Sequence, residues 1–175
     1  MERIHLEDGL HIRPARDGDQ NFFHDLYAET RKDLSDTIDN KEVLHEIIDL
    51  QFRAQSHSYS TQYPNAYYFV VEKHGEKIGR ATLDFSDDDV HLVDLALVQK
   101  ARGKGIGKAV IRGIMSCAEK IGAPMRLAVF HNNVQAKAIY TNLGFVRYST
   151  IPPYEYWIWH PAALRHRDIV RSANL

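Results

Sequence analysis

The sequence lacks the features that mark secreted, disulfide-linked and membrane-spanning proteins. It contains one cysteine, Cys117, so no disulfide can form within the chain, which fits a reducing compartment. No run of about 18 apolar residues occurs, and the start Met-Glu-Arg-Ile-His has no signal-peptide core. We therefore expect a cytoplasmic protein that does not bind membranes.

A strong excess of charge is also absent. The 22 Lys and Arg residues nearly balance the 23 Asp and Glu residues, and the formal net charge of −1 gives no overall attraction for nucleic acid. No spacing of His, Cys, Asp and Glu is typical of a metal site, so we expect no metal. The 175 residues suffice for one domain with a full core. We expect this domain over residues 1–160 and a C-terminal tail over residues 161–175.

Glycine is scarce, with 10 residues, yet three glycines alternate within the segment Arg102-Gly-Lys-Gly-Ile-Gly-Lys108. An apolar run ends at Val98 just before this segment, and a helical pattern leads from it to Ile121. Glycines leave backbone N–H groups bare, and a helix N-terminus adds the positive end of its dipole, so this turn suits an anion such as phosphate. Five basic residues with no acid between them favour a ligand with several phosphates: Lys100, Arg102, Lys104, Lys108 and Arg112.

The spacing of these glycines excludes the two best-known phosphate loops. A P-loop requires Ser or Thr after its lysine, but Lys108 is followed by Ala109. A dinucleotide fingerprint requires another glycine at its last position, and counting from either Gly103 or Gly105 finds none there. A turn that only caps a helix is the remaining alternative, which the three glycines and five bases disfavour.

A second motif occupies the segment Asn133–Phe145. Its apolar residues, which include Ala136 and Tyr140, repeat at helical spacing and fall on one face of a helix. Gly144 can adopt the left-handed conformation that ends a helix. The segment therefore predicts a helix followed by a strand.

Together, the spacing Arg102-x-x-Gly105-x-Gly107 and the segment Asn133–Phe145 resemble the acyl-CoA-binding loop and a later helix of the GNAT family of N-acetyltransferases. The segment Gln51–Gln55 with Tyr63-Pro64 resembles uncharacterised bacterial members. The resemblance implies an α/β (α+β) fold, in which helices cover both faces of a mixed, strongly curved central sheet of about seven strands. The implied order is β-α-α-β-β-β-α-β-α-β-β.

Hydrophobic periodicity and turn residues place these elements on the chain. We expect strands over 10–16, 66–72, 78–85, 90–98, 125–130, 145–150 and 154–159. Helices are expected from residue 17 through the stripe Phe22–Tyr27, and over 41–55, 104–121 and 133–143, with a loop over 56–65. The turn Asp87-Asp88-Asp89 is expected to be a solvated hairpin tip.

The resemblance also assigns roles to residues. It implies acetyl-CoA as co-substrate and direct transfer of its acetyl group to a primary amine of a small molecule or peptide. Tyr140 matches the family's general acid, which protonates the departing thiolate, although a tyrosine that only packs in the core is the alternative. Asn133 is expected to hydrogen-bond the pantetheine or nucleotide end. The backbone groups expected to hold the pantetheine and the pyrophosphate belong to Leu97, Val98, Arg102, Gly103, Lys104, Gly105, Ile106, Gly107 and Lys108.

Asp94 is an acid within the otherwise apolar run over 93–98, where an unpaired charge would be unfavourable. Its carboxylate could take a proton from the acceptor amine or bind that amine; equally, backbone groups or an arginine could satisfy it. His131 is a competing base, although a solvated histidine is the simpler interpretation. Cys117 shares an apolar helix face with Val110, which indicates packing rather than nucleophilic catalysis.

Two other functions use the same residues. One is a CoA-binding regulatory or interaction module on the same fold without catalysis, and the other is a general nucleotide-phosphate binder. Tyr140 together with an intact glycine loop favours the enzyme, and the missing P-loop and dinucleotide spacings count against the general binder. The sequence leaves open which amine is acetylated, how long the acyl group is, and whether the chain is a monomer or a homodimer.

Overall fold

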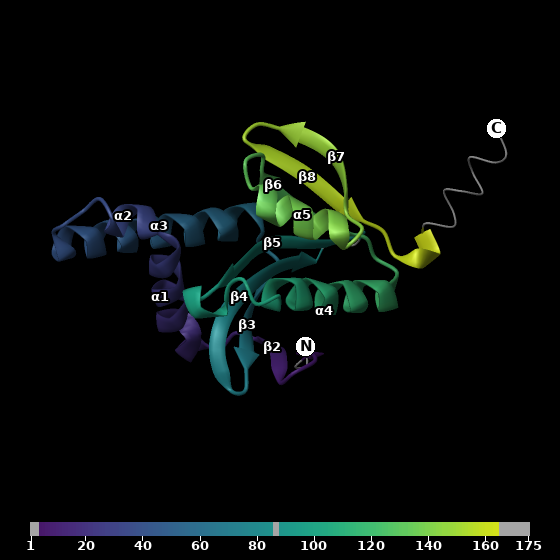
Figure 1. Cartoon of the computed structure of the whole chain (residues 1–175), viewed down its shortest axis with the longest axis horizontal. Helices are drawn as coiled ribbons and strands as arrows, with labels where there is room; N and C mark the ends of the chain where they lie inside the picture. The colour runs from purple at the N-terminus through teal and green to yellow at the C-terminus, as the bar shows by residue number, and fades with distance from the viewer. Residues whose placement is uncertain (1–3, 86–87, 165–175) are drawn as a thin grey trace. The chain divides into compact units, whose positions relative to one another are not determined.

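The structure, a computed structural model, describes residues 4–85 and 88–164 (Figure 1). Its helices are α1 (Gln20–Thr30), α2 (Lys32–Ser35), α3 (Lys41–Gln62), α4 (Ile106–Ile121) and α5 (Val134–Asn142), with 3-10 turns η1 (Asp17–Asp19) and η2 (Gln99–Ala101). Its strands are β1 (Ile4–His5), β2 (Leu10–Pro14), β3 (Ala66–Lys73), β4 (Glu76–Phe85), β5 (Val90–Leu97), β6 (Met125–Phe130), β7 (Val146–Ile151) and β8 (Tyr154–Trp159). Backbone pairing joins the strands in the order β1-β2-β3-β4-β5-β6-β8-β7.

Contacts within the chain divide the described residues into two compact units. The first comprises residues 4–82 and 94–107, and the second comprises residues 83–85, 88–93 and 108–164. The division runs through β4, β5 and the first turn of α4. The single domain expected over residues 1–160 stays a prediction, and the expected tail beyond residue 164 lies outside the described residues.

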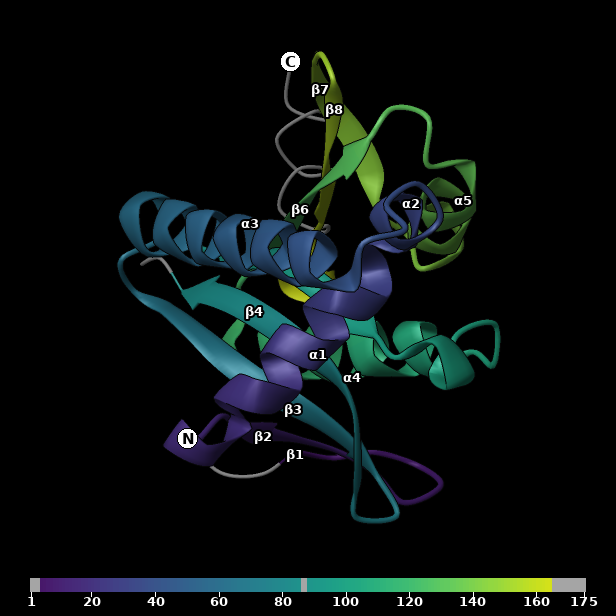
Figure 2. The ribbon, with the colours of Figure 1, turned by 90° about the vertical axis from the view of Figure 1, so that its left-hand side faces the viewer.

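The core of the first unit forms where α1 lies across β3 and β4 (Figure 2). Strands β2 and β3 pair antiparallel with Ile12 opposite Val71, and both side chains are fully buried. Phe23 and Leu26 supply the buried stripe of α1. The guanidinium carbon of Arg80 on β4 lies 5.6 Å from the centre of the Phe23 ring, within the range of a cation–π contact. The helix is therefore fixed against β4 by apolar burial and by this contact.

A buried ionic network fixes the start of α1. The Arg13 guanidinium donates to Asp19 at 2.7 Å and to Glu72 at 2.7 Å, and the Lys77 ammonium contacts Asp19 at 2.6 Å. Asp19 also accepts from the backbone N–H of Arg16 at 2.9 Å, which caps η1. The hydrogen bond from Arg13 holds the pKa of the Asp19 carboxyl far below its ordinary value. Buried charges persist when they are paired in this way.

The second unit is built on β6, which pairs on one side with β5 and on the other with β8. The β5 pairing is parallel and spans Val90–Leu92, while the β8 pairing is antiparallel and places Met125 opposite Trp159. Helix α4 buries Val110 and neighbouring apolar residues on one face.

Among helices within residues 4–85 and 88–164, none has the length and apolar character needed to cross a membrane.

Apart from the short helix α2, which was not expected, the fold expected from the sequence is confirmed with four differences. The described residues form eight strands rather than about seven, because Ile4–His5 adds a short β1 to β2. The helix expected from residue 17 opens with the 3-10 turn η1, whose capping box is closed by the Asp19 side chain. The loop expected over 56–65 is wrong for residues 56–62, because α3 continues to Gln62.

The fourth difference concerns the acidic turn before β5. A solvated tip was expected for Asp87, Asp88 and Asp89, and Asp88 is indeed exposed. Asp89 is instead buried, and its carboxylate forms an ion pair with the Arg126 guanidinium of β6. The sequence pattern of three acids gave no sign of this partner, which β5–β6 pairing brings close. Asp87 lies outside the described residues.

Candidate active site

The glycine-rich loop leads from η2 into α4 and belongs to the first unit as far as Gly107. Gly103 and Gly105 have φ angles of 72° and 76°, in the left-handed region that favours glycine. A Cβ added to either one would meet no other atom within 4 Å, so this side of the loop is open. Bare backbone at the start of a 16-residue helix can hold an anion.

Gly107 differs from the two glycines before it. Its φ lies outside the left-handed region, and an added Cβ would make an ordinary contact of 3.7 Å with the Leu97 side chain. Ile106 beside it is buried and anchors the first turn of α4. Lys108, the last residue of the expected loop, belongs to the second unit.

The backbone expected to hold the pantetheine already has protein partners. The Val98 N–H donates to the Ile78 carbonyl at 2.9 Å, and the Val98 carbonyl accepts from the Ala101 N–H at 2.9 Å. The Arg102 side chain donates through Nε to the Leu97 carbonyl at 2.7 Å. A ligand on this strand must therefore share these carbonyls, each of which has a second lone pair, or displace the Arg102 side chain.

Asp94 lies on β5 and pairs with an arginine, one of the alternatives open at the sequence level. Arg80 on β4 donates to the Asp94 carboxylate at 2.7 Å and approaches the Gln55 side-chain oxygen of α3 at 3.4 Å. The Arg80 side chain is 6% exposed and that of Asp94 is 23% exposed. The carboxylate is thus held in one orientation and stays open to a ligand.

Sequence reasoning missed both Arg80 and Gly79 on β4. A Cβ added to Gly79 would lie 2.6 Å from the Ala96 carbonyl oxygen, so glycine is needed where β4 approaches β5. In the sequence, Arg80 is only a basic residue inside an apolar strand pattern, and a basic residue in such a pattern can equally face solvent. Its role appears only once β4 is placed beside Asp94.

Asn133 and Tyr140 belong to the second unit, on α5. The Asn133 carbonyl oxygen Oδ1 accepts from the Ala136 N–H at 3.1 Å and caps the helix, so its amide Nδ2 is the group that can donate to a ligand. Tyr140 is half-buried, and its ring centre lies 5.8 Å from that of Phe145. Gly144, with a φ of 87°, ends the helix as its position predicted.

His131 and Cys117, the other residues considered for a catalytic role, lie in different surroundings. The His131 Nδ1 lies 3.0 Å from the Pro153 carbonyl, and the ring is exposed. Cys117 is a free, half-buried thiol on α4. Within the part of the chain that the structure describes, no group of three or more His, Cys, Asp or Glu residues is arranged to hold a metal ion.

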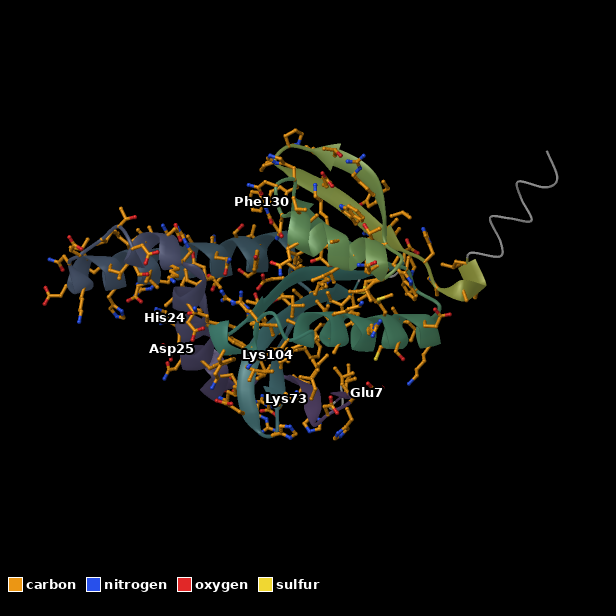
Figure 3. All side chains as sticks on the ribbon, viewed as in Figure 1. Glu7, His24, Asp25, Lys73, Lys104 and Phe130 are labelled. Carbon is orange, nitrogen blue, oxygen red and sulfur yellow. The ribbon has the colours of Figure 1, made fainter. Side chains whose placement is uncertain are left out.

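Aromatic residues gather between α1 and α3. The Tyr27 and Phe52 rings lie 5.6 Å apart, and the His24 Nε2 contacts Asp49 at 2.6 Å beside them. Figure 3 shows His24 and Asp25 on the α1 side of the molecule. The first unit thus contains Asp94, the glycine loop and this aromatic surface, while Asn133 and Tyr140 belong to the second unit.

A mixed sheet with an open glycine loop at a helix start defines an α/β protein with a loop whose bare backbone could hold an anion. The model of the acetyltransferase (GNAT) family matches residues 23–145, which is most of the chain. The chain therefore belongs to the GNAT acetyltransferase family, and the family recognised in the sequence is confirmed.

Individual relatives are more distant. Beta-lysine N(6)-acetyltransferase of Methanosarcina mazei is 24% identical over 115 residues, which are 65% of this chain. The match spans 37% of the length of that relative. The PaiA N-acetyltransferase of Thermoplasma acidophilum, solved with coenzyme A, superposes with a TM-score of 0.66 at 18% identity, covering 86% of this chain and 98% of the other. The ribosomal L7/L12 alpha-N-protein acetyltransferase RimL with coenzyme A gives 0.65 at 13% identity, over 93% and 99%.

Proposed function

We propose that the chain is an N-acetyltransferase that transfers the acetyl group of acetyl-CoA directly to a primary amine. The observation that carries this proposal is the glycine loop. Gly103 and Gly105 turn bare backbone toward open space at the start of α4, inside the segment matched by the family model. Coenzyme A in the structures of two similar proteins supports acetyl-CoA as the ligand of this loop.

In the proposed reaction, the acceptor amine attacks the thioester carbonyl carbon. A C–N bond forms, the C–S bond breaks, the amine loses a proton, and the thiolate gains one. We assign Tyr140 as the acid that protonates the thiolate. Asp94 is the group assigned to the amine, because its carboxylate is oriented by Arg80 and stays partly exposed. Holding amine and thioester together contributes further to the rate.

The acceptor is proposed to be a primary amine of a small molecule or a peptide. Two similar proteins are named for such acceptors, one for the N(6) amine of beta-lysine and one for the alpha-amine of a ribosomal protein. The two named acceptors differ in molecular size, but both are amines. The expected cytoplasmic location stays a prediction.

A thiol-release assay with acetyl-CoA tests the proposal. Amino acids, polyamines and peptides serve as acceptors, and mass spectrometry verifies a gain of one acetyl group on the amine. Steady release that depends on the acceptor is expected. If acetyl-CoA binds while no amine in the panel is acetylated, the alternative of a CoA-binding regulatory module is favoured. If acetyl-CoA does not bind at all, the assignment of the loop is wrong.

A further inference from the structure

Helix α3 has apolar residues on two faces, and one of these faces packs against α1 (Figure 2). The packing face includes Ile48, which is 7% exposed, and Phe52, whose ring centre lies 5.4 Å from that of His24. The other face carries apolar residues at positions i, i+4, i+7 and i+11, which align along one side of a helix. We call this set the outer stripe, and it consists of Val43, Ile47, Leu50 and Ala54.

The outer stripe is open to solvent. Val43 and Leu50 are 43% and 69% exposed. Ala54 is also exposed, and Ile47 is half-buried. Single exposed apolar residues are common on protein surfaces, but several that adjoin along one helix face are typical of an interaction site. Asn40 fixes the start of this face, because its side-chain oxygen accepts from the Val43 N–H at 3.2 Å.

The outer stripe is symmetric about its midpoint. Val43 and Ala54 lie equally far from this midpoint along the chain, and so do Ile47 and Leu50. When two copies of α3 lie antiparallel about a two-fold axis at the midpoint, Ile47 of one copy faces Leu50 of the other, and Val43 faces Ala54. The alternating spacing of four and three residues is that of the core positions of a coiled coil. One register thus buries the whole stripe of both copies.

The charges beside the outer stripe match the same register. Glu46 and Arg53 are exposed and flank the stripe on one side. In the antiparallel pair, Glu46 of one copy is offset from Arg53 of the other by only about 3 Å along the helix axis, at a rise of about 1.5 Å per residue. The two-fold axis forms this ion pair twice. The other side of the stripe carries the uncharged Gln51 and Ser58, so no like charges oppose each other there.

We propose that the outer stripe joins two copies of this chain in an antiparallel, two-fold pair of α3 helices. The occupant is a second copy because the apolar residues and the charges complement themselves in one register, which a two-fold dimer requires and another partner does not. A short stripe is sufficient, since α3 is already ordered against α1 and association does not have to fold it. One helix pair is smaller than a standard interface, so we expect a micromolar dissociation constant.

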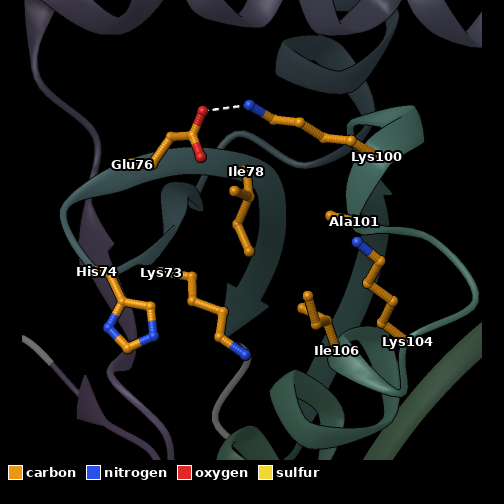
Figure 4. Close-up of a pocket in the computed structure, with 8 residues that line it drawn as sticks. All are labelled: Lys73, His74, Glu76, Ile78, Lys100, Ala101, Lys104 and Ile106. Carbon is orange, nitrogen blue, oxygen red and sulfur yellow. Dashed lines mark hydrogen bonds and ion pairs between the residues drawn. The ribbon is translucent and has the colours of Figure 1, made fainter.

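The outer stripe is separate from the glycine loop. A pocket of about 350 Å³ adjoins that loop, and Figure 4 shows its lining from the β3–β4 hairpin, η2, the loop and the start of α4. The described residues that line this pocket all lie outside α3. Substitutions in the outer stripe therefore leave the pocket lining unchanged, and the dimer does not depend on the proposed function.

Sedimentation velocity from about 1 µM to about 1 mM protein tests the proposal. The wild type should pass from monomer to dimer within this range. Leu50→Glu places a charge in the middle of the stripe and should raise the dissociation constant at least about tenfold. Because Leu50 is 69% exposed, the thermal unfolding of this variant should match the wild type. Val146→Glu is the matched control, since it makes the same kind of change at a residue of β7 that is 58% exposed and should leave the dimer unchanged.

Charge reversal tests the orientation of the helix pair. Glu46→Arg and Arg53→Glu should each raise the dissociation constant about tenfold, because each replaces two attractive contacts with two repulsive ones. The double variant Glu46→Arg/Arg53→Glu should restore the wild-type value, since both ion pairs return with their signs exchanged. In a parallel pair, Glu46 and Arg53 would face the uncharged Gln51 and Ser58, and this pattern of loss and rescue would not occur.

Three results overturn the proposal. The first is a wild type that stays monomeric at about 1 mM. The second is a dimer that Leu50→Glu leaves unchanged, because such a dimer uses another face, and its loss in Val146→Glu would identify that face as β7. The third is a dimer that the double charge reversal does not restore. None of these measurements uses acetyl-CoA, so failure of the proposed function appears only in the thiol-release assay and leaves this test valid.

Discussion

Arg80 on β4 and Asp94 on β5 form an ion pair of 2.7 Å, with the arginine side chain 6% exposed. Arg80 otherwise contacts the Gln55 oxygen at 3.4 Å and the Phe23 ring, so Asp94 is the one acid paired with it among the described residues. A buried charge that loses its partner is strongly unfavourable. Asp94 therefore supports the fold in addition to any role with the acceptor amine.

The first prediction separates these two roles of Asp94. Asp94→Asn should lower the free energy of unfolding by about 2–4 kcal/mol, because the buried Arg80 charge loses its counterion. If Asp94 also acts on the amine, the turnover number of the folded variant should fall and its pH dependence should shift under saturating acetyl-CoA. Chemical unfolding and pH–rate profiles measure the two effects independently.

The double variant Arg80→Met/Asp94→Asn is the control, because it removes the buried charge together with its partner. Its stability should recover relative to Asp94→Asn, since no unpaired guanidinium remains. Turnover should stay low if the carboxylate is needed by the amine. Recovery of both stability and turnover would show that Asp94 acts only through Arg80.

The second prediction concerns the open side of the glycine loop. Gly105→Ala places a Cβ at a φ of 76°, which is disfavoured by about 1–2 kcal/mol, and points it into the space left for the anion. Acetyl-CoA affinity should fall at least tenfold by calorimetry. Gly107→Ala is the matched control, because its added Cβ makes an ordinary 3.7 Å contact and its φ is not left-handed. Equal loss of affinity in both variants would argue against an anion site formed by the open backbone at Gly105.

Local sequence signals predicted the elements whose boundaries depend on nearby residues. Strands β6 and β8 lie where alternating apolar residues between turn signals placed them, and Gly144 ends α5. Helix α3 shows where such signals fail. The polar segment 56–62 resembles a loop in composition, yet half-buried Ser56 and Tyr59 continue the helical face. Helical spacing of residues that can pack on one face therefore predicts this segment better than its polar composition does.

Partners across strands were beyond the reach of the sequence. Arg80 and Asp94 are separated by 14 positions, and Asp89 reaches Arg126 on β6. Each contact depends on which strands are neighbours and in which register, and a one-residue shift would turn either side chain to the other face. The residue types at the site were predictable, but their counterions were not.

The third prediction concerns protonation of the leaving thiolate. Tyr140→Phe keeps the ring beside Phe145 and removes only the hydroxyl. General acid catalysis contributes about 10²–10⁴-fold, so turnover should fall by that order while acetyl-CoA affinity stays nearly constant. Tyr148→Phe makes the same chemical change on an exposed tyrosine of β7 and should be neutral. Near-normal turnover of Tyr140→Phe would reduce the role of Tyr140 to packing.

The last prediction concerns the pH dependence of stability at β5. Burial lowers the pKa of His91 below its ordinary value, nearby Arg126 lowers it further, and Asp89 and Asp84 oppose the shift. The unfolded chain therefore takes up this proton at a higher pH than the folded protein does. By linkage, His91 leaves stability unchanged well above pH 6.5 and lowers it as pH falls through about 6.5 toward the folded pKa, with a slope of at most about 1.4 kcal/mol per pH unit.

His91→Gln should remove this contribution because glutamine does not titrate. We expect the free energy of unfolding of the wild type to decrease between pH 7 and 5, and that of His91→Gln to decrease less. The exposed His57 of α3 provides the control, since its side chain faces solvent in the folded protein. His57→Gln should therefore follow the wild-type profile. Parallel profiles for wild type and His91→Gln would show that His91 is not the group whose protonation destabilises the fold.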